Sequence, residues 1–257
     1  MNGRGWGSRR PEGVVFDTDG VLLDSAVLHA AAWKIAFDAC LRRLAPADGT
    51  QPPFDADAEY RRLVDGRSRY DGAEAFLTAR GLHLPPGDSG DSPGHGTVWA
   101  VAAHKERAFL DLLRTQGVTA FADVHPALMA LRTAGVPCAA VSASRHARTL
   151  IHAAGLAGLL TVIVDGTDAT RLGLVGKPDP ALFLRATALL GGRAQESAVV
   201  EDALAGVEAG RRGGFGLVVG VDRTSRQSTT ALLREGGADL VVPDLATLVR
   251  SVWGERG

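Results

Sequence analysis

Two aspartates, Asp17 and Asp19, directly follow a short apolar run near the start of the chain. Carboxylates at the carboxyl end of a strand stand where open α/β sheets bind their ligands. One carboxylate could attack a substrate as a nucleophile while the other transfers a proton. The pair alone is a weak indication, because aspartate also favours turns and Gly20 permits one.

Polar residues also follow two other apolar runs. Ser142 comes after the run that ends at Val141, at an expected helix start, where a hydroxyl and backbone N–H groups favour an anion. Glu201 and Asp202 follow a second run, and Lys177 lies just before a helix between these two places. Acids from separate strand ends repel one another unless a hard cation lies between them, and Mg²⁺ prefers oxygen ligands.

This combination of residues favours phosphoryl transfer. A carboxylate attacks phosphorus only when the phosphoryl charge is neutralised, which Mg²⁺ and Lys177 would supply. We therefore expect Asp17 to be the nucleophile, and Asp19 to protonate the leaving oxygen and later to activate the acceptor hydroxyl or water. Pro178 follows Lys177 and no upstream glycine completes a Walker A loop, nor does G-x-G-x-x-G follow the first strand, so kinase and nicotinamide chemistry are excluded.

Six short apolar runs predict the strands that must position these residues. Continuous apolar runs are typical of parallel strands that are covered on both faces. The expected strands are Val14–Asp17, Pro137–Ser142, Thr161–Asp165, Ala198–Glu201, Leu217–Val221 and Leu240–Val242. Their alternation with helices predicts an α/β fold with a Rossmann-like, doubly wound parallel sheet.

The pattern changes between about Ser25 and Thr119, where no convincing strand occurs and apolar residues recur at helical spacing. We expect a helical insert at residues 26–117 and a core domain made of residues 12–25 and 118–257. Residues 1–11 are expected to be a flexible leader. Within the insert, the expected helices are Ala26–Leu44, Ala58–Val64, Ala73–Arg80 and Val98–Arg114.

Local signals predict several helix ends and one loop. Pro126 is expected at the first position of a helix that Gly135 closes, while Asp179 would cap a helix that starts at Pro180. Residues 85–96 are rich in Gly, Pro, Ser and Asp but lack the closing glutamate of a calcium loop. We expect a mobile surface loop there.

The composition of the 257 residues excludes other classes. The 28 basic and 29 acidic residues leave a net charge of -1, which argues against nucleic acid or an anionic membrane as a partner. Without a membrane-length apolar run or a secretory signal, a cytoplasmic protein is expected. Cys40 and Cys138 are expected to be small buried hydrophobes. Only three of the basic residues are lysine: Lys34, Lys105 and Lys177. They are either there by chance or kept because a lysine supplies a compact ammonium that arginine lacks.

The chemical residues resemble the four motifs of the haloacid dehalogenase (HAD) superfamily of aspartate-nucleophile phosphotransferases, in order and over essentially the whole chain. The matching segments are Asp17–Ser25, Val141–Ser142, Gly176–Pro180, and Val200–Asp202 with Ala205 and Gly206. The resemblance implies that Mg²⁺ is held by the Asp17 carboxylate, the backbone carbonyl of Asp19 and Asp202, with Glu201 assisting. It also implies that the insert is a cap that closes over the site.

Within the superfamily the chain is most similar to the β-phosphoglucomutase-like subfamily. His29 and Trp33 share one face of the first expected cap helix and match that subfamily, although an ordinary apolar stripe with one histidine is the alternative. Lys105 falls where the subfamily has a cap lysine that reaches the active site.

Two segments resemble phosphate-binding loops of that subfamily. Gly66, Ser68 and Arg69 resemble the cap loop for the second, non-transferring phosphate, which a forked guanidinium suits; a solvated surface arginine is the alternative. The loop beside the transferring phosphate would comprise Ser142, Ala143, Ser144 and Arg145.

Two departures, Glu106 and His146, stand where the family commonly has asparagine, and they leave the native sugar open. The expected function is a Mg²⁺-dependent mutase that converts β-D-glucose 1-phosphate to glucose 6-phosphate through an aspartyl-phosphate. A phosphatase that hydrolyses a small sugar phosphate is the alternative, and a non-catalytic sugar-phosphate sensor is a third. The expected partner is a small-molecule sugar phosphate, and a monomer is expected because the cap must swing.

Overall fold

The computed structural model describes residues 10–44, 51–224 and 226–254. Most of the expected leader and residues 45–50 of the insert therefore lie outside the described residues. The chain divides into two compact units, of which one ends at Asp24 and resumes at Thr119, while the other is Ser25–Val118. We call these two units the core and the cap.

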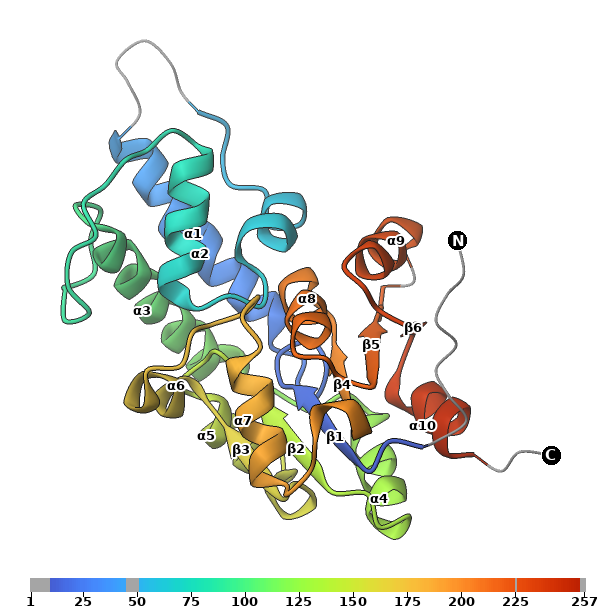
Figure 1. Cartoon of the computed structure of the whole chain (residues 1–257). Coiled ribbons are helices and arrows are strands. Elements are labelled where there is room, and N and C mark those ends of the chain that lie inside the picture. The colour runs from blue at the N-terminus through green and yellow to red at the C-terminus, as the bar shows by residue number, and fades with distance from the viewer. Residues whose placement is uncertain (1–9, 45–50, 225, 255–257) are drawn as a thin grey trace. The chain divides into compact units, whose positions relative to one another are not determined.

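Within the described residues, the core is built on one parallel sheet of six strands in the order β3-β2-β1-β4-β5-β6 (Figure 1). The strands are β1 (Gly13–Asp17), β2 (Cys138–Val141), β3 (Val162–Val164), β4 (Ser197–Glu201), β5 (Leu217–Val221) and β6 (Leu240–Val242). Every residue of β1 is buried, as expected for a strand covered on both faces. The predicted doubly wound α/β fold is confirmed, and each strand differs from its predicted range by at most one residue at either end.

Helices of the core pack against this sheet. Helix α7 contacts the first three strands, α8 contacts β4 and β5, and α9 contacts β5 and β6; α4 packs on β2, and α10 on β6 and α4. The core helices are α4 (Val124–Thr133), α5 (Ala147–Ala153), α6 (Gly166–Leu172), α7 (Ala181–Leu189), α8 (Leu204–Arg212), α9 (Gln227–Glu235) and α10 (Leu245–Trp253), with short 3₁₀ turns η2 (Ala157–Leu159) and η3 (Ala194–Glu196). Their placement leaves the carboxyl ends of the strands for chemistry.

Two predicted helix starts in the core are wrong by one or two residues. Helix α4 begins two residues before Pro126, which therefore occupies its third position; proline is tolerated there because the first-turn N–H groups have no partner within the helix. Helix α7 begins at Ala181, with Pro180 as the residue before it. Asp179 still caps this helix, since its carboxylate accepts a hydrogen bond of 2.9 Å from the Ala181 N–H. Gly135, at φ 71°, follows the end of α4 as predicted.

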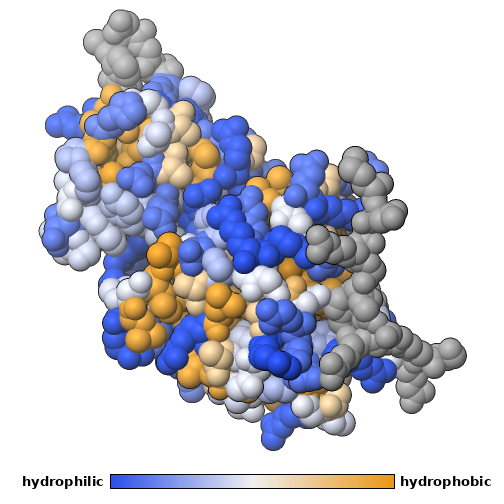
Figure 2. All heavy atoms as spheres, in the orientation of Figure 1, coloured by the Kyte–Doolittle hydropathy of each residue, from blue (hydrophilic) through white to orange (hydrophobic). Residues whose placement is uncertain are grey.

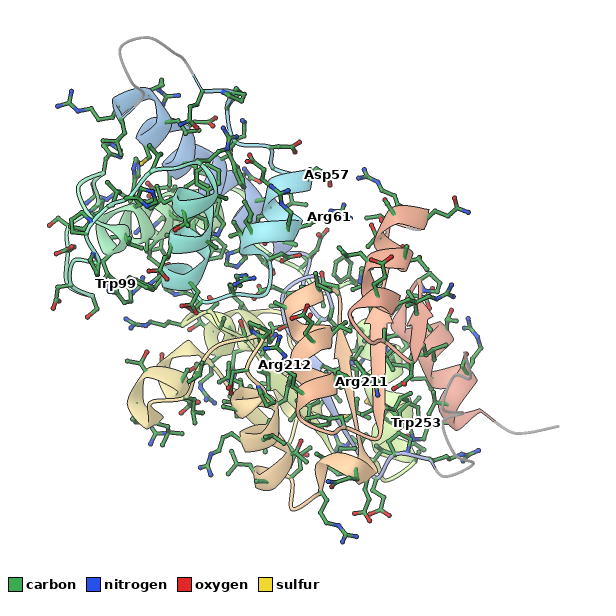
Figure 3. All side chains as sticks on the ribbon, turned by 45° about the horizontal axis from the view of Figure 1, so that its top comes forward. Asp57, Arg61, Trp99, Arg211, Arg212 and Trp253 are labelled. Atoms are coloured by element: carbon green, nitrogen blue, oxygen red, sulfur yellow. The ribbon has the colours of Figure 1, made fainter. Side chains whose placement is uncertain are left out.

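The cap consists of α1 (Ala26–Leu44), α2 (Arg69–Ala79), α3 (Val98–Gln116) and a π-helical turn, η1 (Tyr60–Val64). Helix α1 has its predicted bounds, whereas α2 begins four residues before the predicted Ala73 because Ser68 caps it by accepting from the Asp71 N–H. The predicted helical segment at 58–64 is confirmed, with residues 60–64 forming the π-helical turn η1, and Asp57 pairs with Arg61 at 2.7 Å beside it (Figure 3).

An aromatic cluster forms the centre of the cap. Phe37 stacks on Trp33 and Phe76 with ring centroids 4.7 and 3.8 Å apart, and Phe54 meets Phe37 at 5.0 Å. Cys40 belongs to the same buried cluster. As predicted, both cysteines are buried and neither forms a disulfide. Large buried rings of this kind supply much of the stabilisation of a small helical unit.

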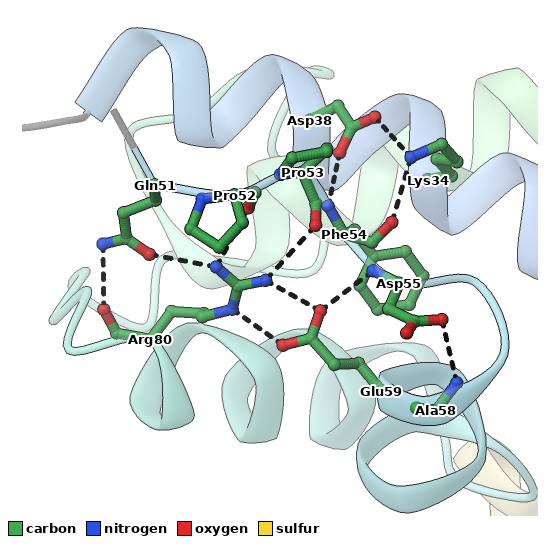
Figure 4. Close-up of polar contacts among 10 residues, drawn as sticks. All are labelled: Lys34, Asp38, Gln51, Pro52, Pro53, Phe54, Asp55, Ala58, Glu59 and Arg80. Atoms are coloured by element: carbon green, nitrogen blue, oxygen red, sulfur yellow. Dashed lines mark hydrogen bonds and ion pairs between the residues drawn. The ribbon is translucent and has the colours of Figure 1, made fainter. Parts of the chain in front are cut away.

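A polar network ties the segment before η1 to α2 (Figure 4). The guanidinium of Arg80 donates through Nε and Nη2 to the carboxylate of Glu59, at 2.7 and 2.8 Å, and through Nη1 to the Pro52 carbonyl at 3.0 Å. Lys34 pairs with Asp38 at 3.0 Å and donates to a carbonyl of the same segment. A fork-shaped guanidinium suits such bidentate pairing.

The loop at 85–96 is closed by its own hydrogen bonds. The carboxylate of Asp91 accepts from the Thr97 hydroxyl at 2.5 Å and from the Asp88 N–H at 3.1 Å. These acids form no group of three that could hold a metal ion among the described residues. The loop is thus a hydrogen-bonded surface turn.

Apolar side chains gather on the surface over α6 and α7 (Figure 2). Among the large apolar residues exposed in that region are Leu172, Val175 and Leu184. In the described part of the chain, no helix combines the length and the apolar character that crossing a bilayer requires.

Candidate active site

The carboxyl ends of three neighbouring strands bring the predicted chemical residues of the core together. Strand β1 lies between β2 and β4, with Asp17 in register with Val141. Ser142 therefore follows the strand on one side of Asp17, and Glu201 ends the strand on the other. Parallel strands end at a common edge, so residues far apart in sequence share one site.

Lys177 lies at the centre of this site and is 2% exposed. Its Nζ donates to the Oδ1 of Asp17 and to the Oε1 of Glu201, and it lies 4.8 Å from the centroid of the Phe183 ring. Burial opposes the charged ammonium, but the two carboxylates raise the pKa of Lys177 above its ordinary value. Lys177 is therefore a cation held among acids at every ordinary pH.

The same site carries an excess of buried negative charge. Burial raises the pKa of Asp17 well above its ordinary value; Lys177 opposes this rise, whereas Glu201 and Asp19 add to it. Oxygens of Asp17, Glu201 and Asp202 lie within 4.8 Å of one another. This cluster could hold a metal ion, and its oxygen donors suit a hard cation.

Two glycines leave the space that these acids occupy. A Cβ at Gly20, whose φ is 81°, would lie 1.8 Å from the Oδ2 of Asp202, and a Cβ at Gly206 would lie 1.8 Å from the Oε1 of Glu201. Glu201 is fully buried, and its Oε2 accepts from the N–H groups of Asp202 and Ala203 at 3.0 and 2.9 Å. Glu201 thus orients both the Asp202 loop and Lys177.

The loop after β2 holds the second aspartate. The Ser142 hydroxyl donates to the Oδ2 of Asp19 at 2.9 Å and accepts from the Ser144 N–H at 3.0 Å. Ala143 lies between them, and a Cβ at Gly166 would lie 2.4 Å from its carbonyl oxygen. The exposed Arg145 contacts Thr170 at 3.3 Å, so its guanidinium is directed toward α6.

His146, one of the two departures from the family pattern, ends this loop. Its N–H donates to the Ser144 hydroxyl at 3.2 Å, so its backbone helps to hold the loop before α5.

One residue of the site, Thr18, was not singled out in the sequence. Its side chain is fully buried, and its hydroxyl donates to the Val141 carbonyl at 3.0 Å, which ties the Asp17 turn to β2. Strand alternation was the available signal, because a residue between two aspartates at a strand end points to the opposite face.

Three of the predicted cap residues meet within the cap. The Nζ of Lys105 lies 2.9 Å from the Nδ1 of His29, 4.8 Å from the Phe109 ring centroid and 5.6 Å from that of Trp33. An ammonium has only donors, so Nδ1 of His29 accepts. Lys105 is 5% exposed, which makes it a second buried lysine.

Arg69 is the first residue of α2, directly after the capping Ser68, and its guanidinium lies over the ring of Trp99 at 5.6 Å. Its Nη1 lies 3.6 Å from the Oε2 of Glu106, and both side chains are more than three-quarters buried. Gly66 precedes them with a φ of 72°. The Arg69 side chain is therefore fixed by contacts within the cap, and its ion-pair partner, Glu106, is one of the two residues that depart from the family pattern.

The site combines a buried aspartate that contacts a lysine with further acids and a serine, all at the carboxyl edge of a doubly wound sheet. Together with the helical insert after the first strand, this combination defines a class of phosphotransfer enzymes. The chain belongs to the haloacid dehalogenase-like hydrolases, whose family model matches residues 11–214. It is an enzyme of the β-phosphoglucomutase-like subfamily. A non-catalytic sensor is therefore not supported.

The relatives include β-phosphoglucomutases from three bacteria. Those of Mycobacterium bovis and Mycobacterium tuberculosis are 42% identical over 91% of this chain and 90% of their own length. The β-phosphoglucomutase of Bacillus subtilis is 28% identical over 95% of this chain and 94% of its own. The crystal structure of a β-phosphoglucomutase from Clostridium difficile has the same fold, with a TM-score of 0.69, 21% identity and 93% of each chain covered.

Proposed function

We propose that this chain is a Mg²⁺-dependent mutase that converts β-D-glucose 1-phosphate to glucose 6-phosphate through a phosphorylated Asp17. The buried contact of Lys177 with Asp17 carries the proposal, since it puts an ammonium on the carboxylate that would attack phosphorus. The mycobacterial relatives named β-phosphoglucomutase support this choice of reaction.

Asp17 and Asp19 divide the chemistry between them. In the first step the phosphoryl group leaves Asp17 for the C6 hydroxyl of the substrate, and the Asp19 carboxylate takes the hydroxyl proton. After the bisphosphate has turned around, an Asp17 oxygen bonds to the C1 phosphorus. The P–O bond to C1 then breaks, and Asp19 returns its proton to that oxygen. The Ser142 hydroxyl, 2.9 Å from Asp19, orients this acid.

The acids around Lys177 form the proposed Mg²⁺ site. Asp17, Asp202 and the backbone carbonyl of Asp19 would hold the ion, and Glu201 assists by orienting Asp202 and Lys177. When bound, Mg²⁺ would neutralise charge on the transferring phosphoryl group. We expect Mg²⁺ to raise the unfolding temperature of the wild-type protein and to do so less in Asp202→Asn, because ligands that bind only the folded state stabilise it.

The cap residues are proposed to bind the sugar phosphate. Arg69, with Gly66 and Ser68, would bind the phosphate that is not transferred, while His29, Trp33 and Lys105 would contact the rest of the substrate. In the core, the loop for the transferring phosphate would comprise Ser142, Ala143, Ser144 and Arg145.

A coupled assay for glucose 6-phosphate, with β-glucose 1-phosphate and a trace of the 1,6-bisphosphate, tests the mutase. Glucose 6-phosphate should form without matching release of inorganic phosphate. Inorganic phosphate as the sole product would exclude the mutase and leave the phosphatase.

The ion pair between Arg69 and Glu106 favours a second candidate, a phosphatase of small sugar phosphates. The Glu106 carboxylate lies 3.6 Å from the guanidinium and would repel a second phosphate there, which a mutase needs and a phosphatase does not. A panel of sugars phosphorylated at C1 or at C6, followed for both isomerisation and phosphate release, separates the two candidates. A phosphatase releases phosphate from both series and interconverts neither.

A further inference from the structure

Arg223 joins two segments of the core that lie far from it in sequence. It follows the end of β5, and its Nε and Nη2 donate to the carbonyls of Gly20 and Val21 at 3.0 and 2.7 Å. Its guanidinium also lies 3.7 Å from the centroid of the Phe121 ring. The first segment directly follows the aspartate pair, and the second is the chain on its return from the cap.

Asp123 completes the contacts of this guanidinium. Its two carboxylate oxygens accept from Nη1 and Nη2 of Arg223 at 2.9 and 3.3 Å, and one of them also accepts from the Leu245 N–H at 2.7 Å. Asp123 is the residue before α4, yet its side chain makes no capping bond to that helix. An aspartate before a helix usually caps it by accepting a hydrogen bond from the first turn, but the Asp123 carboxylate is directed to Arg223 instead.

The two segments that Arg223 joins are also paired with each other. The Asp24 N–H donates to the Thr119 carbonyl at 2.9 Å, and the Phe121 N–H donates to the Leu22 carbonyl at 3.3 Å. Arg223 thus bridges both chain connections of the core to the cap, at the place where they run side by side.

The backbone that Arg223 contacts belongs to the turn at residues 17–21, which carries both aspartates and which we call the catalytic turn. Gly20 directly follows Asp19, and the Gly20 Cα lies so close to Asp202 that a Cβ would overlap the carboxylate. We therefore expect a shift of the Gly20 carbonyl to move the adjoining Asp19 and to change its spacing from Asp202. Displacements of about 1 Å in a catalytic group are enough to cost on the order of 10²-fold in rate.

We propose that Arg223 is a positioning residue for proton transfer by Asp19, which it controls by holding the Gly20 and Val21 carbonyls. This role rests on the proposed function of Asp19. An arginine is required because its planar fork reaches two carbonyls and a carboxylate together, which a lysine ammonium does not reproduce.

The test compares two substrates that differ in their need for an acid. The para-nitrophenolate of an aryl phosphate leaves without a proton, whereas the alkoxide of glucose 6-phosphate needs one. Asp19 also serves the later step on the aspartyl-phosphate that both substrates share, so the rate is taken from release of the leaving group, glucose or para-nitrophenolate, in a single turnover. We expect Arg223→Gln to lower this rate by ~10²-fold on glucose 6-phosphate and by less than ~5-fold on para-nitrophenyl phosphate. Asp19→Asn serves as the benchmark for complete loss of the acid.

A matched control is Arg211→Gln. Arg211 lies in the same core at the end of α8, where it also donates to a carbonyl, that of Gly237, and pairs with a carboxylate, Asp239, at 2.5 Å (Figure 3). It loses the same kinds of contact without touching the catalytic turn. The ratio of sugar-phosphate to aryl-phosphate turnover should stay within ~2-fold of wild type, since removal of a distant contact acts on stability alone.

The outcomes separate this proposal from the proposed function. An equal loss on both substrates in Arg223→Gln, or no loss, overturns the role of Arg223. Should that variant fail to fold, Arg223→Lys decides: a wild-type substrate ratio overturns the proposal, and an intermediate ratio supports it. A wild-type chain that releases the leaving group from neither substrate, or an Asp17→Asn variant that still releases it, contradicts the proposed function instead.

Discussion

The core and the cap each bury one lysine, in different surroundings. Lys177 of the core is 2% exposed and contacts two carboxylates, Asp17 and Glu201. Lys105 of the cap is 5% exposed and contacts the Nδ1 of His29 and the faces of the Trp33 and Phe109 rings. The Lys177 ammonium thus contacts opposite charge, whereas the contacts of the Lys105 ammonium include a ring nitrogen and aromatic faces.

Under the proposed function, each region keeps its cation for phosphate in a different way. In the core, the carboxyl ends of the strands converge and bring several acids beside the buried lysine, which would stabilise these acids until a phosphoryl group binds. In the cap, the lysine is presented from helix faces on which aromatic residues already form the apolar packing. We therefore expect changes in the core to remove activity on every substrate, and changes in the cap to alter the choice among substrates.

The largest effect is expected from Asp17→Asn, which removes the nucleophile. Turnover should fall by at least ~10⁴-fold on sugar and aryl phosphates alike, because both would pass through the same aspartyl-phosphate. The unfolding temperature of the metal-free protein should stay the same or rise, since burial and neighbouring acids raise the pKa of Asp17 and its charge is a cost to folding. Retained activity, measured as phosphate release, would show that Asp17 is not the nucleophile.

Lys105→Met tests the expectation that a change in the cap alters the choice among substrates. Methionine keeps the length and removes the charge, so kcat/KM on β-glucose 1-phosphate should fall by ~10²-fold while turnover of para-nitrophenyl phosphate changes by less than ~3-fold. The lysine on α1, Lys34, offers a matched control, because its side chain is 44% exposed and, among the described residues, its ammonium contacts Asp38 and the Phe54 carbonyl. If Lys34→Met lost as much as Lys105→Met, the cap lysine would have no special role.

Glu106→Gln tests whether the ion pair in the cap limits the second phosphate. Neutralising the carboxylate frees the Arg69 guanidinium, so KM for a sugar bisphosphate should fall by ~10-fold, or about 1.4 kcal/mol, with a smaller change for a monophosphate. Arg69→Gln should abolish this difference. Equal KM values in Glu106→Gln and the wild type would remove the argument for the phosphatase.

The smallest effect is expected from Glu59→Gln, which breaks the Arg80 network shown in Figure 4. Hydrogen bonds from Arg80 lower the pKa of Glu59 below its ordinary value of 4.5. A carboxyl with a lowered pKa stabilises the folded state above that ordinary value, and the contribution is lost as the pH falls through its folded-state pKa. Denaturant unfolding should show a difference between wild type and variant at pH 7 of about 1 kcal/mol that vanishes in acid. A difference that persists at low pH would point to packing.

The sequence indicates the core site better than the cap site for a physical reason. Asp17, Ser142 and Glu201 each end an apolar run, and parallel strands bring such ends to one edge, so their proximity follows from local pattern alone. Helix α1 was predicted with its observed bounds because its apolar spacing is long and regular. The helical segment at 58–64 was also predicted, but its π-helical hydrogen bonding was not, because bonds that reach one residue further along the chain leave no periodic signature in five residues.

What the sequence by itself determined is the sheet, the helical insert and the residues at the strand ends, since each is written in local periodicity and in residue type. Only the tertiary structure decided which charges meet. Lys177 is 160 residues from Asp17, Arg223 is 203 from Gly20, and Glu106 reaches Arg69 from another helix. No local pattern specifies such pairs, because they arise when separately formed elements pack and each buried charge must find an opposite charge or an acceptor.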